Sequence, residues 1–208
     1  MDYPDIAFDL YHPQPLLIVI SGLSGAGKDT VLGVLKKSRK PLSFVVTATS
    51  RAPRNSETHG VDYFFYSREE FEEMIERGEF LEVSVVYQDY KGIPKEQVRQ
   101  AFESGKDVVL RVDVQGAQKL RSLYPEAVLI FITPENSKEW YERLVNRHTE
   151  TRESIQMRVE MARRELESLN IFDYVVVNRQ NCLNEAVDTI LNIIDAEHHK
   201  MKHKKISL

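Results

Sequence analysis

Short runs of apolar, mostly β-branched residues alternate along the chain with longer amphipathic segments. These runs predict five strands: Leu16–Ile20, Phe44–Val46, Val108–Val112, Val128–Ile132 and Val175–Val177. Continuous apolar runs of this length are typical of strands buried on both faces, as in a parallel sheet. The segments between them predict five helices: Asp29–Lys37, Val114–Leu123, Ser137–Arg147, Arg152–Leu169 and Leu183–Lys200. This alternation predicts an α/β fold with right-handed crossovers.

Residues 47 to about 100 interrupt the alternation. A polar, turn-rich stretch, Ser50–Gly60, precedes a predicted strand at Val61–Phe65 and an acidic helix at Glu69–Arg77. Further strand-like pieces follow at Phe80–Val86 and near Tyr87–Tyr90. We therefore expect an insertion on the parallel core, built on a small antiparallel sheet.

Composition and charge narrow the classes of function. The chain has 208 residues, of which 42% are apolar and 29% charged, as in ordinary globular proteins. Its net charge of −4 argues against a protein that coats nucleic acid, but a local basic pocket could still bind a small anion. The single cysteine, Cys182, cannot form an internal disulfide, which fits a reducing compartment. No apolar run approaches the ~20 residues of a spanning helix.

The two ends of the chain differ from its middle. Residues 1–15 contain three prolines and lack the pattern of a secretory signal or a transit peptide, so we expect an irregular leader. Residues 198–208 are rich in Lys and His, and we expect a solvated, frayed helix end there rather than a metal or nucleic-acid site. Together with the composition, these features predict a cytoplasmic protein with neither a membrane nor a nucleic acid as partner.

A glycine-rich loop follows the first predicted strand and leads into a predicted helix. It has the G-x-x-x-x-G-K pattern of a phosphate-binding loop in the strand–loop–helix context which that pattern requires. Glycines allow backbone N–H groups to converge on phosphate oxygens, and the helix N-terminus adds a positive dipole end. Lys28 would then reach the β- and γ-phosphates. The predicted ATP-binding residues of this loop are Gly22, Leu23, Ser24, Gly25, Ala26, Gly27, Lys28, Asp29 and Thr30.

Position 29 departs from the phosphate-loop pattern. The residue after the lysine is normally Ser or Thr, whose hydroxyl binds Mg²⁺, but here it is Asp29. A carboxylate can also hold Mg²⁺, directly or through water. It can equally serve as a first-turn acid that the helix dipole favours, and the sequence leaves both interpretations open.

Two arginines follow the second predicted strand. Arg51 and Arg54 lie three residues apart in a turn stiffened by Pro53, an arrangement that suits a phosphate dianion. The segment Gly60–Phe65 brings the hydroxyl of Tyr63 into the same insertion. On these residues alone, a solvated loop remains the simpler interpretation.

In order and spacing, seven segments of the chain resemble the guanylate kinase family over residues 16 to about 195. They are Ser21–Lys28, Thr47–Arg54, Gly60–Phe65, Glu79–Glu82, Asp113–Ala117, Arg143–Thr149 and Phe172–Asn178. The resemblance implies a P-loop NTPase-type parallel sheet flanked by helices, with a nucleoside-monophosphate-binding insertion and a helical lid. It implies transfer of the ATP γ-phosphoryl group to GMP, and also to dGMP, with Mg²⁺. The implied catalytic domain is 16–197, divided into a core (16–46, 101–140 and 171–197), an insertion (47–100) and a lid (141–170).

The resemblance also assigns residues to GMP. Arg51, Arg54 and Tyr63 match residues that hold the GMP phosphate, and Glu82 matches the carboxylate that accepts guanine N1–H and N2–H₂. Adenine would leave that carboxylate unpaired, because it has an acceptor at N1 and no N2 amine. From spacing alone, Glu82 could instead be a solvated acid at a strand end. The remaining implied GMP positions are Thr47, Lys91, Ile93 and Asp113, of which Asp113 also lies near the metal, through water.

Three arginines match family residues that contact the transferring phosphates. They are Arg143, Arg147 and Arg158 and, with Lys28, form the implied catalytic set; Asn178 is an implied ATP contact. Phosphoryl transfer spreads charge over three oxygens, so alignment and positive charge carry most of the catalysis. GMP itself would attack the γ-phosphorus in line, with no protein nucleophile. Salt-bridged surface arginines are the alternative, since four glutamates lie nearby in sequence: Glu142, Glu150, Glu153 and Glu160.

Three positions depart from the commonest family pattern. Lys91 stands where many members have Tyr, Ile93 where they have Ser or Thr, and Arg111 where an acid is usual. Together with the Gly-Lys-Asp sequence of the phosphate loop, these departures resemble the plastid-type branch. Two other functions are considered: a ribose bisphosphate kinase of the same fold, and a non-catalytic protein-binding module. The module typically lacks the loop lysine, which this chain retains.

Overall fold

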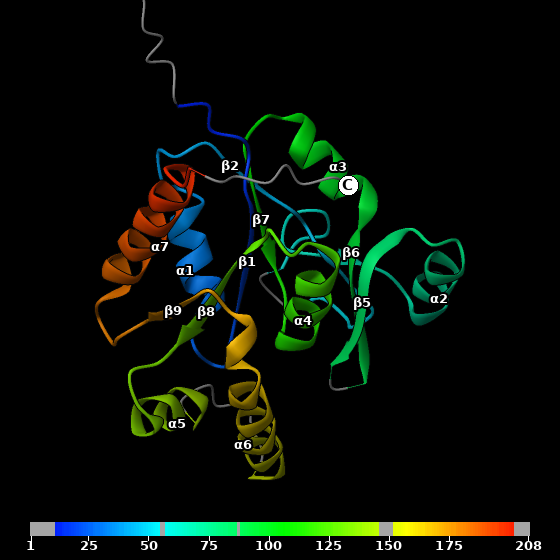
Figure 1. Cartoon of the computed structure of the whole chain (residues 1–208). Helices are drawn as coiled ribbons and strands as arrows, with labels where there is room; N and C mark the ends of the chain where they lie inside the picture. The colour runs from blue at the N-terminus through cyan, green and yellow to red at the C-terminus, as the bar shows by residue number, and fades with distance from the viewer. Residues whose placement is uncertain (1–10, 55–56, 87, 146–151, 202–208) are drawn as a thin grey trace, which may run out of the picture.

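A parallel sheet forms the centre of the computed structural model, which describes residues 11–54, 57–86, 88–145 and 152–201. Within these residues the sheet has five strands in the order β2-β7-β1-β8-β9 (Figure 1). Their bounds are β1 Leu17–Gly22, β2 Leu42–Phe44, β7 Asp107–Arg111, β8 Val128–Thr133 and β9 Tyr174–Val177. Strand β1 pairs in parallel with both β7 and β8 and is buried along its whole length. The predicted α/β fold with a parallel sheet is confirmed.

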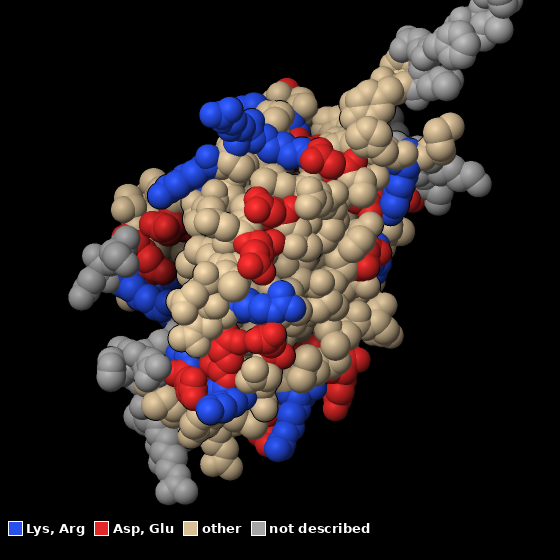
Figure 2. Space-filling model, turned by 90° about the vertical axis from the view of Figure 1, so that its left-hand side faces the viewer, with Lys and Arg blue, Asp and Glu red and all other residues tan. Residues whose placement is uncertain are grey.

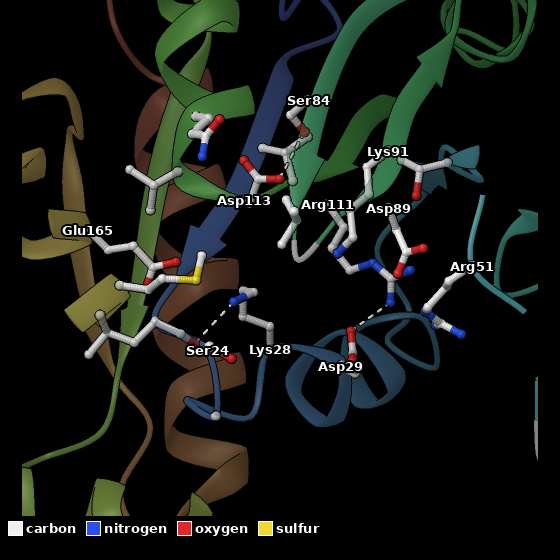
Figure 3. Close-up of a pocket in the computed structure, with 18 of the residues that line it drawn as sticks. Ser24, Lys28, Asp29, Arg51, Ser84, Asp89, Lys91, Arg111, Asp113 and Glu165 are labelled. Atoms are coloured by element: carbon white, nitrogen blue, oxygen red, sulfur yellow. Dashed lines mark hydrogen bonds and ion pairs between the residues drawn. The ribbon is translucent and has the colours of Figure 1, made fainter. Parts of the chain in front are cut away.

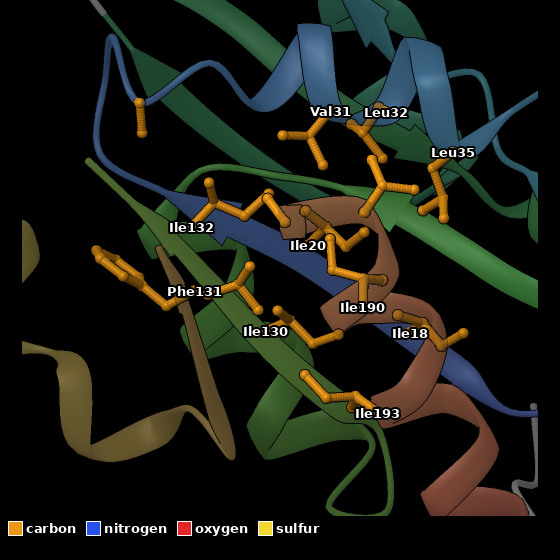
Figure 4. Close-up of a cluster of buried hydrophobic side chains, with 14 of the residues drawn as sticks. Ile18, Ile20, Val31, Leu32, Leu35, Ile130, Phe131, Ile132, Ile190 and Ile193 are labelled. Atoms are coloured by element: carbon orange, nitrogen blue, oxygen red, sulfur yellow. The ribbon is translucent and has the colours of Figure 1, made fainter. Parts of the chain in front are cut away.

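Helices cover both faces of this sheet. Successive side chains of a strand point to opposite faces. Ile18 and Ile20 of β1 therefore face α1 (Lys28–Leu35) and α7 (Leu183–His198), whose aliphatic side chains fill the cluster in Figure 4. The alternate residues of β1 belong to a second cluster with α3 (Lys95–Glu103) and α4 (Val114–Leu123). The central strand is thus fixed from both sides, and the loop that follows it has a rigid base.

A second, smaller sheet lies beside the core in the order β4-β3-β6-β5 (Figure 1). Its strands are β3 Ala48–Thr49, β4 Phe64–Phe65, β5 Phe80–Val86 and β6 Asp89–Pro94. Helix α2 (Arg68–Glu76) packs Phe71 onto Phe80, with ring centroids 4.4 Å apart, and gives this sheet its own apolar cluster. The helix begins with a capping box between Ser67 and Glu70. The small sheet is mixed rather than antiparallel, because β3 and β4 run parallel.

One helix of the structure is missing from the sequence prediction. Helix α3 packs Val98 and Ala101 on the core sheet, but most of its other residues are polar, so its apolar face is narrow. Helix α4 keeps its predicted bounds, whereas β2 ends at Phe44, where the predicted strand began. The last segment of the fold comprises α5 (Ser137–Val145), α6 (Arg152–Glu167) and a 3-10 helix (Leu169–Ile171). Figure 1 shows α5 and α6 at the edge of the molecule beyond β8.

The two ends of the described chain meet at the start of β7. Buried Asp107 accepts hydrogen bonds from the backbone N–H of Leu16, at 3.0 Å, and contacts His198 Nε2 at 2.8 Å. Residues 11–15 form neither helix nor strand, as expected for a leader. The side chain of His198 is only 13% exposed, which differs from the solvated tail that we predicted. Residues 1–10 and 202–208 lie outside the described residues.

The surface seen in Figure 2 carries basic and acidic side chains interspersed among neutral ones. No helix within the described ranges is both long and apolar enough to span a lipid bilayer.

Replacement of Asp107 should lower the stability of the fold. Asp107→Ala removes the acceptor of the Leu16 N–H and the contact with His198 Nε2 in a buried place, so the free energy of unfolding should fall by about 2–3 kcal/mol. The measurement is urea unfolding followed by circular dichroism. The matched control is Asp195→Ala, whose carboxylate is 63% exposed and pairs with Lys40. An exposed pair of this kind is worth about 0–1 kcal/mol, so equal losses in the two variants would contradict the assignment.

Candidate functional site

A cavity of about 720 Å³ lies where the phosphate loop, the small sheet and helix α6 meet. The core contributes the loop and the carboxyl ends of β1 and β7, which is where ligands bind in open α/β sheets. In Figure 3, Lys28 lies between Glu165 on one side and Asp29, Arg111 and Arg51 on the other. The predicted site residues that line the cavity are Leu23, Ser24, Gly25, Gly27, Lys28, Asp29, Thr30, Thr47, Arg51, Arg54, Tyr63, Glu82, Lys91, Ile93, Asp113 and Arg158.

The phosphate loop needs glycine at two of its positions. Gly22 has φ +144°, and a Cβ there would lie 2.0 Å from the carbonyl oxygen of Ile132. Gly27, the N-cap of α1, has φ +83°, and a Cβ there would lie 2.5 Å from Asn178 Nδ2. L-residues with side chains rarely adopt such φ values, and neither place has room for a side chain. The local sequence therefore fixes a tight turn that opens into the N-terminus of α1.

Side chains from α5 and from the end of β9 hold the loop by its carbonyl groups. Asn178 Nδ2 donates to Ala26 O at 2.8 Å, and Arg143 Nη1 donates to the same oxygen at 3.2 Å. Trp140 Nε1 donates to Ser24 O at 2.8 Å. The predicted residues Arg143 and Asn178 thus contact the backbone of the loop. In the described structure the cavity lining does not include these two residues, nor Gly22 and Ala26. Arg147 lies outside the described residues.

Lys28 folds back over the loop toward the cavity. Its Nζ donates to Gly22 O at 2.6 Å and to Leu23 O at 3.1 Å. Burial lowers the pKa of Lys28, while the carboxylates of Glu165 and Asp29 oppose that change. Glu165 and Asp29 therefore both act on the ammonium group of Lys28.

Helix α6 reaches the loop through two side chains. Arg158 Nη1 donates to Ser24 Oγ at 2.6 Å, and the backbone of Ser24 acts to lower the pKa of Glu165. Burial raises the pKa of Glu165, although Lys28 acts against it. Sequence reasoning missed Glu165, but its spacing of seven residues from Arg158 places the two on one helix face and could have indicated it. Helix α6 thus brings one cation and one acid onto the phosphate loop.

Asp29 forms an ion pair that neither interpretation of the sequence included. Arg111 Nη1, at the end of β7, donates to Asp29 Oδ1 at 2.6 Å (Figure 3). The two residues are 82 positions apart in the chain, so their contact could not be read from local spacing. The side chain of Asp29 is 72% exposed, and the pair lies at the cavity wall rather than in the core.

The two predicted phosphate arginines differ in their surroundings. Both Nη atoms of Arg51 donate to Glu57, each at 2.6 Å, and its guanidinium lies 5.1 Å from the centroid of the Tyr63 ring. The hydrogen bond from Arg51 lowers the pKa of Glu57 to about 2, so Glu57 is charged at neutral pH. Arg54 is exposed at the rim of the same cavity. Sequence analysis did not foresee Glu57, which an arriving anion would have to displace from Arg51.

Glu82 is a buried acid on β5. Its side chain is 3% exposed, and Lys119 Nζ lies 3.2 Å from Oε1. That contact lacks hydrogen-bond geometry, and within the described part of the chain Oε1 has no hydrogen-bond partner. Burial raises the pKa of Glu82 to about 7, against the attraction of Lys119. The interpretation of Glu82 as a solvated acid, which spacing alone allowed, is therefore wrong. Its carboxyl group lines the cavity without its full set of hydrogen bonds.

Asp113 is fixed by two hydrogen bonds. As the N-cap of α4, its Oδ1 accepts the Gly116 N–H at 2.9 Å, and its Oδ2 accepts from Ser84 Oγ at 3.0 Å. Thr47 is buried beside the cavity, and Ile93, at 1% exposure, belongs to the apolar cluster of α3. Lys91 also lines the wall. The cavity wall on the side of the small sheet is thus held in place at Asp113.

This arrangement suits a ligand with phosphate at one end and a hydrogen-bond donor edge at the other. The loop amides, Lys28 and Arg158 can bind one phosphate chain, while Arg51, Arg54 and Tyr63 can bind a second phosphate group. Glu82 can accept two N–H groups from a planar base. Within the described residues, no cluster of three or more His, Cys, Asp or Glu side chains could hold a metal ion by itself.

Comparison with known proteins gives consistent matches over most of the chain. The family model for guanylate kinase matches residues 14–197. Guanylate kinase 2, chloroplastic/mitochondrial, of Oryza sativa subsp. japonica is 48% identical over 197 residues, which cover 94% of this chain and 69% of the relative. Guanylate kinase of Shouchella clausii is 44% identical, with 89% of each chain covered. The crystal structure of guanylate kinase from Anaplasma phagocytophilum superposes with a TM-score of 0.75 at 30% identity, covering 91% of this chain and 89% of that one.

The buried acid Glu82 should make the protein less stable as the pH rises. Its pKa is about 7 in the folded protein and 4.5 in a solvated reference, so the folded state binds the proton more tightly between these values. Stability from this group is present below about pH 4.5 and is lost as the pH rises through about 7, by about 3 kcal/mol. Glu82→Gln removes the titration, so the variant should gain stability over the wild type between about pH 5 and pH 8.

Urea unfolding across that pH range measures the difference. The matched control is Glu79→Gln, which changes an exposed acid just before β5. Its stability should vary with pH as that of the wild type does. Parallel pH curves for wild type and Glu82→Gln would contradict the raised pKa.

Proposed function

Because the chain belongs to the guanylate kinase family, and a plant chloroplastic/mitochondrial relative supports its plastid-type branch, we propose that it phosphorylates GMP with ATP. The products are ADP and GDP, and dGMP is a second acceptor. One observation carries this proposal: a single cavity has the phosphate loop with Lys28 at one end and the buried, under-satisfied Glu82 at the other. Glu165, on the phosphate-loop side of the same cavity, also has a buried carboxyl oxygen without a hydrogen-bond partner among the described residues, but Glu82 is the one on the small-sheet side.

ATP binds at the phosphate loop. The amides of Gly25 and Gly27 lie in a turn that leads into the α1 N-terminus, which favours the β- and γ-phosphates. Lys28 leaves its carbonyl acceptors for the phosphates, and Arg158 approaches from α6. Arg143 and Asn178 act by holding the loop through Ala26 O. Arg147 is assigned by family pattern alone.

GMP binds on the small-sheet side. Guanine N1–H and N2–H₂ donate to Glu82, which offers Oε1 without a hydrogen-bond partner in the described structure. Arg51, Arg54 and Tyr63 hold the phosphate, with Lys91 on the same wall, and Thr47 and Asp113 border the base. Arg51 exchanges Glu57 for the GMP phosphate, so one charged partner replaces another. Ile93 supplies apolar contact only, since its side chain has no donor.

Magnesium would arrive with ATP. Mg²⁺ is usually held by phosphates and water with one or two carboxylates, and the cavity has Asp29 beside Lys28 and Asp113 across from it. Asp29 contacts Arg111 through Oδ1, so Oδ2 is the atom that would reach a magnesium-bound water. Both oxygens of Asp113 are already hydrogen-bonded, which suits a contact through water rather than direct binding. When bound, the ion screens the negative charge of the two phosphate groups.

The reaction is a direct in-line transfer. A phosphate oxygen of GMP attacks the γ-phosphorus of ATP, the bond to the β-phosphate oxygen breaks, and ADP leaves. Lys28 and Arg158 compensate the charge on the transferring group, and positioning of the two ends supplies most of the acceleration. Closure of α5 and α6 over the substrates excludes water, which would otherwise accept the phosphoryl group.

The separate apolar cluster of the small sheet supports the division into core, insertion and lid. A cytoplasmic location stays a prediction.

The two alternative functions are not favoured. A non-catalytic module has no use for an intact loop with Lys28, and guanylate kinases cover most of this chain at 40–48% identity. A ribose bisphosphate has no base to pair with Glu82, whose buried charge would then be left without a ligand.

The choice of acceptor tests the proposal. With GMP, dGMP, AMP, UMP and ribose 1,5-bisphosphate in a coupled ADP assay, GMP and dGMP should react best, by up to ~10⁴-fold over AMP. Glu82→Gln should lower the GMP-to-AMP ratio of kcat/KM by roughly 100-fold, because the amide presents both a donor and an acceptor. Glu79→Gln serves as control. A preference for any other acceptor would overturn the proposed function, and an unchanged ratio would remove Glu82 as the base reader.

Lys28→Ala tests the donor side. The variant should keep its circular dichroism spectrum and lose about 10²- to 10³-fold in kcat with GMP, because one preorganised charge is removed from the transferring phosphates. The control is Lys37→Ala, an exposed lysine near the end of the same helix, which should react as the wild type does. Equal rates for Lys28→Ala and wild type would refute the loop assignment.

A further inference from the structure

Arg111 touches two parts of the cavity wall that lie far apart in sequence. Its Nη1 donates to Asp29 Oδ1 at 2.6 Å, and its Nη2 donates to the carbonyl oxygen of Asp62 at 3.2 Å. Its guanidinium carbon lies 4.3 Å from the centroid of the Tyr63 ring. One side chain on β7 therefore links the first turn of α1 to the loop that carries Tyr63.

The two residues of the ion pair are also the two places where the sequence reverses the usual chemistry. Position 29 has an acid where a hydroxyl is normal, and position 111 has a base where an acid is usual. The structure brings these two departures into contact at 2.6 Å, so each supplies the partner that the other requires. The side chain of Asp29 is 72% exposed and that of Arg111 is 23% exposed, so the apolar core does not require the pair.

The Tyr63 ring contacts the guanidinium groups of two arginines that lie far apart in the sequence. Arg51 lies 5.1 Å from its ring centroid and Arg111 lies 4.3 Å from it. Arg51 also donates two hydrogen bonds to Glu57, within the same insertion. Arg111 instead belongs to core strand β7 and forms an ion pair with Asp29 of α1. Arg111 therefore links the Tyr63 loop directly to the first turn of α1, next to the phosphate loop.

We propose that Arg111 is a positioning residue for the acceptor, which sets the Tyr63 loop at its GMP-binding distance from the phosphate loop through the Asp29–Arg111 ion pair. The inference rests on the proposed function, since it takes GMP as the ligand of Tyr63. It makes a specific claim: Asp29, a residue of the ATP loop, contributes to GMP affinity even when ATP and metal are absent.

Calorimetric titration of GMP into the whole protein, with EDTA and without ATP, tests this claim. Arg111→Ala and Asp29→Ala should each weaken GMP binding roughly tenfold, because a misplaced contact loop loses preorganisation. The double variant should bind no worse than the weaker single variant, since both changes break one link. Arg111→Lys keeps the charge for Asp29 but not the planar group over Tyr63, so it should recover only part of the loss.

Controls separate positioning from damage to the fold. Arg99→Ala, which removes an exposed arginine paired with Glu96 on α3, should bind GMP as the wild type does. Thermal melting should agree among all variants, and in the full assay Arg111→Ala should raise KM for GMP more than it lowers kcat. Unchanged GMP affinity in Arg111→Ala, or losses that multiply in the double variant, would overturn the inference while leaving GMP phosphorylation intact. Failure of the wild type to bind GMP would overturn the proposed function itself.

Discussion

The backbone of the phosphate loop is the constraint on which the rest of the structure depends. Gly22 and Gly27 adopt conformations that leave no room for a Cβ, and the loop they form ends at the N-terminus of α1. Asn178, Trp140 and Arg143 bind carbonyl oxygens of that loop from distant elements. Because β1 is buried from both sides, the loop that follows it starts from a fixed base. The parallel sheet and its helices therefore serve to hold a set of amide groups at one edge.

The acceptor side of the cavity follows a different principle. Glu82 is buried with an incompletely satisfied carboxyl group, which costs stability at neutral pH. A cost of this kind is expected where a ligand supplies the missing donors, since the same unpaired group then rejects bases that cannot donate. Arg51 shows the opposite solution, because Glu57 satisfies its charge until an anion replaces it. In this site the Glu82 carboxyl group thus lacks hydrogen bonds that a ligand could supply, whereas the Arg51 guanidinium is already paired with Glu57.

Local pattern was enough to predict the core but not the contacts across the cavity. The phosphate loop and α4 were predictable, because glycine spacing and helix periodicity act over a few residues. Helix α3 was missed because its apolar face is narrow, and the parallel pairing of β3 with β4 joins segments that no short pattern connects. The Asp29–Arg111 pair and the reach of Glu165 to Ser24 depend on how distant elements pack. Sequence could mark positions 29 and 111 as unusual, but only the fold shows that they meet.

The central claim is that one cavity aligns two nucleotides end to end, with the guanine edge on Glu82 and the phosphates between Lys28 and Arg51. A crystal structure with an analogue that joins adenosine and guanosine through a chain of phosphates would test it most directly. We expect guanine N1 and N2 within hydrogen-bond distance of the Glu82 carboxylate, the phosphate chain on the loop amides, and Arg51 released from Glu57. Guanine bound elsewhere, or a phosphate chain that leaves Lys28 on its carbonyl acceptors, would contradict the claim.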